Sequence, residues 1–147
     1  MIRYRERIFP AAAAALWLVF LFLDLTRAAD STRVKFAAVC LCLITALTGR
    51  ESTDRRLVAL ALCFTVGADW FLLVRDDHYL MGVALFSVVQ LLYALRLFRL
   101  RGGCLCPWGL ALRPAALAAG LLLGRRDPIT GLSLFYFSNL AVNTAEA

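Results

Sequence analysis

The chain has 147 residues, of which 62% are hydrophobic, and its mean hydropathy is +0.76. Soluble domains contain about 45–50% apolar residues, so this composition excludes an ordinary soluble domain and indicates an integral membrane protein. The net charge of +6 comes from residues that lie mainly between apolar runs, so it indicates orientation in a membrane rather than binding to nucleic acid.

Six apolar segments follow one another along the chain. Leu, Ala and Phe dominate them, and none shows the alternation of a β-barrel strand, so we expect all six to be helices. A spanning helix needs about 20 residues, so the second and sixth segments must use flanking residues. The short connections predict antiparallel neighbours in one transmembrane domain over residues 1–147. The predicted fold is therefore an all-α polytopic transmembrane bundle of about six helices, with spans near 9–25, 34–48, 57–74, 79–98, 104–123 and 129–142.

Two of the predicted helices carry local signals. Asp127 followed by Pro128 suits the N-cap and first turn of the sixth helix. In the fifth segment, Gly120 and Gly124 have the spacing of a helix-packing motif. Pro114 in the same segment is expected to kink the helix or to mark a broken start.

The cations between the segments predict how the chain is oriented. Roughly nine lie on the side of the N-terminus and six on the other side, which predicts a multi-pass protein of the cell membrane with a cytoplasmic N-terminus. The first group is Arg3, Arg5, Arg7, Arg50, Arg55, Arg56, Arg96, Arg99 and Arg101, and the second is Arg27, Arg33, Lys35, Arg75, Arg125 and Arg126.

The five cysteines indicate neither a metal site nor a redox site. Most of them lie inside apolar segments, their spacing matches no zinc or thioredoxin pattern, and the chain has one histidine. They are Cys40, Cys42, Cys63, Cys104 and Cys106. We therefore expect small buried side chains and no metal or cofactor.

Asp69 is the most informative residue, because it lies inside the third apolar segment. A carboxylate at the centre of a spanning helix costs roughly 2.5–3.5 kcal/mol on insertion scales, and such residues usually face a polar cavity or a partner. Asp69 is therefore either an acid that lines a cavity or half of an ion pair with Lys35 or Arg75. The predicted topology places Asp24 and His78 in the same half of the bundle.

Other polar residues are candidates to line such a cavity. Gln90 either contacts a ligand or bonds a neighbouring helix, and Tyr93 either lines the cavity or belongs to the interfacial belt. Lys35 either positions Asp69 or extends to the membrane surface. Asn139 and Asn143, one turn apart, are expected to form a polar seam toward the bundle centre. His78 is expected to be a solvated loop residue.

These residues carry a resemblance to a known family. Residues 67–73 (Gly-Ala-Asp-Trp-Phe-Leu-Leu), a short turn, and then Tyr79, Gly82, Phe86, Gln90 and Tyr93 resemble the paired third and fourth helices of the YhhN family. Lys35-Phe36 and the run from Phe135 to Ala147 are similar to its second and sixth helices. The family includes lysoplasmalogenases, which hydrolyse the vinyl-ether bond of lysoplasmalogens.

The resemblance implies a hydrolase whose substrate is a membrane lipid or lysolipid. Asp69 would be its catalytic acid and base, and Lys35, Gln90, Tyr93, Asn139 and Asn143 would bind substrate. The chain departs from the family pattern in having Ala68 between Gly67 and Asp69, and an amide at Gln90 where histidine is frequent.

Members of the family resemble bundles of about eight helices and carry a second aspartate in a late helix. We therefore expect a C-terminally shortened member, in which Asp24 or Glu146 would have to supply the second acid. Two other functions stay open: a non-enzymatic protein that binds lipid or a partner subunit, and an ion-coupled transporter, for which the chain lacks paired broken helices and an inverted repeat.

Overall fold

The computed structural model describes residues 2–26, 30–49, 52–104 and 107–147. Arg27, Arg50 and Cys106, which entered the predictions above, lie outside the described residues, as do the side chains of Arg3, Arg5 and Arg7. In the described ranges the chain forms helices and no strand, so the all-α fold class is confirmed. The helices are α1 (Ile2–Thr26), α2 (Thr32–Thr48), α3 (Thr53–Asp69), the π-helical turn η1 (Trp70–Val74), α4 (Tyr79–Leu100), α5 (Pro107–Gly124) and α6 (Pro128–Glu146).

Local chemistry explains several of the helix ends. The Ser52 side chain caps α3 by accepting a hydrogen bond from the Arg55 backbone N–H at 3.1 Å. The Asp127 side chain caps α6 by accepting from the backbone N–H groups of Ile129 and Thr130, with Pro128 in the first turn, as predicted. α4 ends before Gly102 and Gly103, which both have positive φ. α5 starts at Pro107, three residues later than expected, and runs through Pro114 as one helix.

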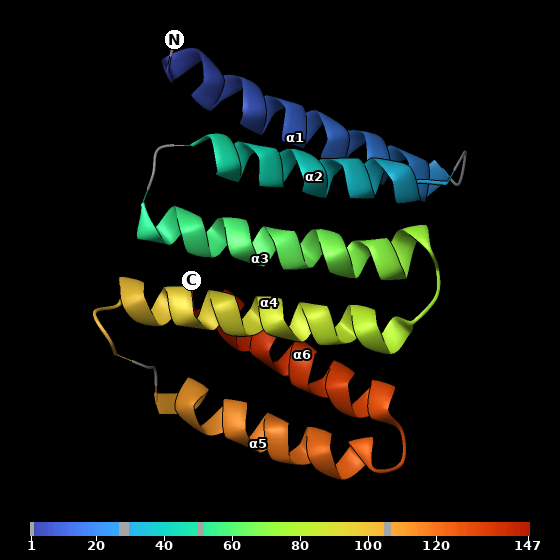
Figure 1. Cartoon of the computed structure of the whole chain (residues 1–147), viewed down its shortest axis with the longest axis vertical. Helices are drawn as coiled ribbons and strands as arrows, with labels where there is room; N and C mark the ends of the chain where they lie inside the picture. The colour runs from blue at the N-terminus through green and yellow to red at the C-terminus, as the bar shows by residue number, and fades with distance from the viewer. Residues whose placement is uncertain (1, 27–29, 50–51, 105–106) are drawn as a thin grey trace.

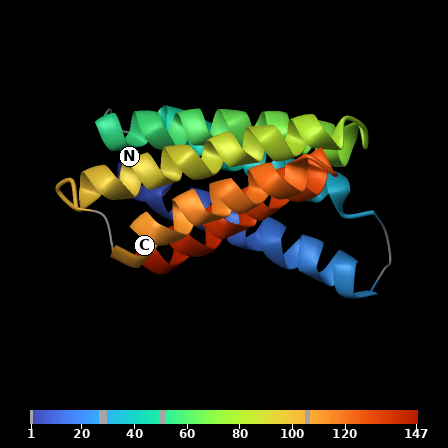
Figure 2. The same ribbon diagram turned by 90° about the horizontal axis from the view of Figure 1, so that it is seen from below.

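The helices are arranged in a curved row (Figure 1). Contacts join α1 to α2, α2 to α3, α3 to α4, α4 to α6 and α6 to α5. Within the described ranges α4 and α5 do not contact each other, and α6 lies behind them (Figure 1). Seen along the row, α6 is set to one side of α3 and α4 (Figure 2). α4 and α5 therefore both pack against α6.

The bundle has an apolar exterior and an interior of small and polar groups. Its buried apolar residues are mostly small, whereas large apolar side chains on α1, α4 and α5 are exposed. The buried polar residues are Ser31, Asp69, Ser87, Gln90, Asn139, Asn143 and Glu146. This distribution is typical of helices packed in lipid, where small residues permit close approach and polar groups join helices.

Three of the described helical segments are long and apolar enough to cross a membrane. They are Thr53–Val74, Tyr79–Leu100 and Pro107–Gly124, and α1 adds a shorter apolar stretch, Ala11–Thr26. A pair of hydrogen bonds of 2.6 and 3.0 Å from Arg96 to Asp54 joins the start of α3 to the end of α4. This bidentate pair fixes α3 and α4 at the end opposite to Asp69.

Candidate functional site

Asp69 lies where the α-helical backbone of α3 changes to the wider π-helical turn η1. The Trp70 backbone N–H still bonds to the carbonyls of Gly67 and Val66. The Arg75 N–H, however, donates to the Trp70 carbonyl five residues earlier, at 2.9 Å. Single π-helical turns are rare in proteins, and many of those that occur lie at functional sites. The backbone is thus irregular immediately after the carboxyl group that the sequence singled out.

The Asp69 side chain is buried but has no polar partner. Its residue exposure is 8%, and among the described residues it forms no hydrogen bond and no ion pair, neither with Lys35 nor with Arg75. The Lys35 ammonium instead lies 2.7 Å from the Asp24 carboxylate, which also accepts a hydrogen bond from the Ser31 hydroxyl. The structural interpretation of Asp69 as half of an ion pair with Lys35 or Arg75 is therefore wrong.

Aromatic side chains from α4 and α6 surround the Asp69 end of the bundle. The Tyr136 phenol is close enough to the Asp69 carboxylate to interact with it electrostatically. The Tyr136 ring lies 5.6 Å from the Phe86 ring, measured between centroids. On the other side of η1, the Trp70 ring lies 6.1 Å from that of Phe36. The Tyr136 hydroxyl is thus within electrostatic range of the Asp69 carboxyl, although no hydrogen bond joins them in the described ranges.

A second buried polar region joins α4, α5 and α6. The Asn143 amide donates to the backbone carbonyl and side-chain oxygen of Gln90, at 2.8 and 3.0 Å. The Arg113 guanidinium donates to the Asn143 side-chain oxygen at 2.9 Å and pairs with the Glu146 carboxylate at 2.8 Å. Gln90 and Asn143 therefore join helices, and the predicted seam is confirmed for Asn143.

Asn139 lies between these two regions on α6. It is fully buried, and its amide group donates to the Phe135 carbonyl at 2.9 Å. Its side-chain oxygen has no hydrogen-bond partner within the part of the chain that the structure describes. A buried acceptor without a donor costs about 1–3 kcal/mol, so this oxygen is available for a water molecule or a ligand hydroxyl.

The remaining predicted binding residues lie apart from Asp69. The Tyr93 phenol interacts electrostatically with Arg96 and with Cys42 of α2, whereas its neighbour Gln90 contacts α6. Lys35 forms its ion pair at the α1–α2 end of the row. The six candidates are therefore not gathered in one site: Gln90 is bonded to Asn143, and Lys35 is paired with Asp24.

The two acids considered as a second catalytic group are both already paired. Glu146 is 4% exposed and bound to Arg113, and Asp24 is bound to Lys35. The His78 imidazole is an exposed loop group that lies 2.8 Å from the Asp77 carboxylate, as expected. No three His, Cys, Asp or Glu side chains in the described ranges are placed to hold a metal ion.

Sequence reasoning missed two residues of these regions. Tyr136 was part of the family-like run but received no role, because nothing in its spacing shows that it faces Asp69. Arg113 received no role either. An arginine within an apolar segment is costly in a membrane, so its position in the sequence was the signal that predicts a buried partner.

Comparison with known proteins agrees with the resemblance that the motifs carry. A model described as the YhhN family matches residues 30–145 of the chain. No curated protein and no solved structure matches it.

Proposed function

The chain belongs to the YhhN family, and on this basis we propose that it hydrolyses the vinyl-ether bond of a lysoplasmalogen-type lipid in the membrane. Asp69 is the catalytic acid and base. The observation that carries the proposal is the Asp69 carboxyl itself, which is buried in an apolar bundle with no ion-pair or hydrogen-bond partner among the described residues. A group held at such cost in a spanning helix is by default functional.

The reaction needs one proton donor and one proton acceptor, and a single carboxyl group can serve as both. The protonated Asp69 transfers its proton to the double-bond carbon that is farther from the ether oxygen, which leaves an oxocarbenium ion at the carbon bonded to that oxygen. Water attacks that carbon and gives its proton to the Asp69 carboxylate. The resulting hemiacetal separates into an aldehyde and the free hydroxyl of the glycerophospholipid.

Neighbouring groups have defined roles in this proposal. The Tyr136 hydroxyl, which lies within electrostatic reach of Asp69, orients the attacking water. The free side-chain oxygen of Asn139 accepts a hydrogen bond from that water or from a glycerol hydroxyl. Gln90 and Asn143 hold α4 and α6 in register, while Lys35 and Tyr93 act at a distance from the reacting bond, on the α2 side.

The test is aldehyde release by the purified protein in lipid nanodiscs containing lysoplasmalogen. Asp69→Asn keeps the shape of the side chain and removes the proton donor, so we expect a loss of about 10²- to 10⁴-fold in turnover. Tyr136→Phe removes only a hydroxyl and should cost about threefold to tenfold. Asp76→Asn, in the exposed loop after η1, is the control and should leave turnover unchanged. Equal turnover of wild type and Asp69→Asn would remove Asp69 from the mechanism.

A second function is favoured by the pairing of the other acids. Glu146 and Asp24 both hold cations, so neither of these two acids is free to divide the chemistry with Asp69. The alternative is a non-enzymatic membrane protein that binds a lysolipid at the same position. Saturable binding of lysoplasmalogen without aldehyde release, abolished by filling the site through Asn139→Leu, would establish this alternative.

A further inference from the structure

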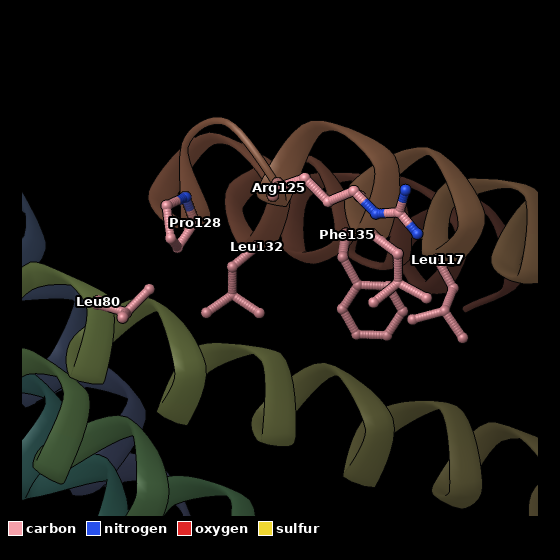
Figure 3. A pocket seen from close by; sticks show the side chains of 10 residues that line it. Leu80, Leu117, Arg125, Pro128, Leu132 and Phe135 are labelled. Carbon is pink, nitrogen blue, oxygen red and sulfur yellow. The ribbon is translucent and has the colours of Figure 1, made fainter.

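A groove lies between the α5–α6 hairpin and the start of α4 (Figure 3). It has a volume of about 670 Å³, within the roughly 300–1,000 Å³ of ligand pockets. Its lining is apolar apart from one cation and includes Leu80, Leu117, Leu121, Arg125, Leu132 and Phe135. Figure 3 shows Leu117, Leu132 and Phe135 projecting from the α5–α6 hairpin toward α4, with Leu80 opposite them.

The groove results from the way in which α6 separates its two neighbours. α4 and α5 both pack on α6, and no contact between them occurs in the described part of the chain. Gly120, Gly124 and Gly131 let the two helices of the hairpin touch through their backbones. A Cβ atom on Gly131 would lie 2.6 Å from the Gly124 nitrogen. The hairpin is therefore narrow, and the space beside it stays open along α4.

The groove and the Asp69 site have no lining residue in common. Phe135 lines the groove, whereas the next residue, Tyr136, faces Phe86 and Asp69. Neither Asp69 nor Asn139 is therefore among the residues that line the groove.

The charge at one end of the groove indicates what fills it. Arg125 follows the last residue of α5, and Leu80 and Pro128 lie in the first turns of α4 and α6, so this end of the groove opens where the helices leave the apolar layer. The exposed Arg125 side chain extends along the hairpin at its rim (Figure 3). A guanidinium matches the geometry of a phosphate with two parallel hydrogen bonds. An apolar slot that ends in such a group complements a phospholipid.

We propose that the groove between α4 and α5 holds an acyl chain of a membrane phospholipid whose phosphate binds Arg125. This lipid is bound on the outer surface of the bundle and is not the substrate at Asp69. It bridges two helices whose described Cα atoms do not come within 8 Å of each other, so its binding stabilises the packing of the α5–α6 hairpin against α4. The inference does not depend on the hydrolysis proposed above.

The test is a titration of the full chain in neutral detergent with phosphatidylglycerol that carries a fluorescent acyl chain. Arg125→Gln should weaken binding about fivefold, the effect of one interfacial arginine on an anionic lipid. Arg126→Gln is the matched control, because this neighbouring exposed arginine does not line the groove; it should change affinity less than twofold. Diacylglycerol with the same chain should bind wild type and Arg125→Gln equally.

A second pair of variants tests the position of the acyl chain. Leu121 and Leu122 are 66% and 65% exposed, but only Leu121 lines the groove. Leu121→Trp should displace the lipid, and Leu122→Trp should not. Equal effects within either pair of variants would overturn the proposal, because they would indicate general attraction to the bundle surface. A changed oligomeric state of Leu121→Trp, measured by light scattering, would also overturn it by showing that a protein helix occupies the groove.

Discussion

Two buried polar regions of this protein differ in how their charges are compensated. Between α4, α5 and α6, Arg113 and Glu146 form an ion pair that Asn143 and Gln90 extend by hydrogen bonds. At the end of α3, the Asp69 carboxyl is equally removed from solvent but has neither a cation nor a donor among the described residues. The first region has the groups that a structural contact needs in an apolar environment.

Burial alone therefore does not distinguish structural from functional polar residues in a membrane bundle. A buried ion pair holds its two helices together. Removing one of the two ions leaves the other buried without an opposite charge. A carboxyl without a partner does not hold helices together in this way, so its presence in a spanning helix indicates another role. The two regions should therefore respond in opposite ways to neutral substitutions.

The largest effect on stability is expected for Arg113→Leu. It leaves Glu146, which is 3% exposed in its side chain, without a cation, and breaking a buried pair from one side costs about 3–5 kcal/mol. The measurement is reversible unfolding of the purified protein in detergent, followed by circular dichroism. In the double variant with Glu146→Leu most of this loss should be recovered. A double variant as unstable as Arg113→Leu would show that the ion pair is not the cause.

A smaller loss of stability is expected for Gly131→Val. This variant tests whether close backbone packing of α5 on α6 is needed to position the Arg113–Glu146 ion pair. The new side chain would meet the backbone of Gly124 at 2.6 Å, and overpacking of this kind costs about 1–3 kcal/mol. Gly67→Ala is the control, because its Cβ atom would lie 3.5 Å from a Leu85 methyl group, an ordinary contact. If both variants unfold like wild type, the close approach of α5 and α6 is not needed.

A still smaller effect, confined to low pH, is expected at the start of α6. Hydrogen bonds from the Thr130 side chain and from the backbone of Ile129 and Thr130 lower the pKa of Asp127 below its ordinary value of 3.8. Its contribution to stability is therefore complete above pH 4 and is lost as the pH falls through the lowered native pKa. Asp127→Asn keeps a capping side chain without the charge. Wild type should keep its advantage over this variant in thermal unfolding down to about pH 4 and lose it as the pH falls further.

The smallest effect on stability is expected for Asp69→Asn, the substitution that should abolish turnover. Because no cation loses its partner, the free energy of unfolding should stay within about 0.5 kcal/mol of wild type or rise. The same detergent unfolding assay as for Arg113→Leu provides the measurement. A loss comparable to that of Arg113→Leu would mean that Asp69 has a structural partner, and the contrast between the two regions would fail.

The sequence predicted the helices because their signals are local. Apolar segments, short polar connections and the Asp127-Pro128 pair are read within a few residues of the chain, and the structure places helices at all six segments. The prediction that Gly120 and Gly124 form a packing surface is confirmed, since both approach Gly131. The length of a helix and the cap at its start depend little on the other helices.

The choice of partners was not predictable in this way. Lys35 was considered either as a partner of Asp69 or as a lysine that extends to the membrane surface, and it pairs with Asp24. Arg113 and Glu146, 33 residues apart, form the buried pair. Which side chains meet depends on the rotation and tilt of each helix, and these are set by packing against all of its neighbours.

The amino-acid sequence by itself determined that the chain is an apolar helical protein of the YhhN type with an acid inside a span. Composition and short-range order suffice for that, because insertion in a membrane depends on the summed hydropathy of consecutive residues. The tertiary structure was needed to show that this acid has no ion-pair partner among the described residues, that Tyr136 lies within electrostatic range of it, and that a groove lies between α4 and the α5–α6 hairpin. These features arise from contacts between residues far apart in the chain, whose distances no local pattern fixes.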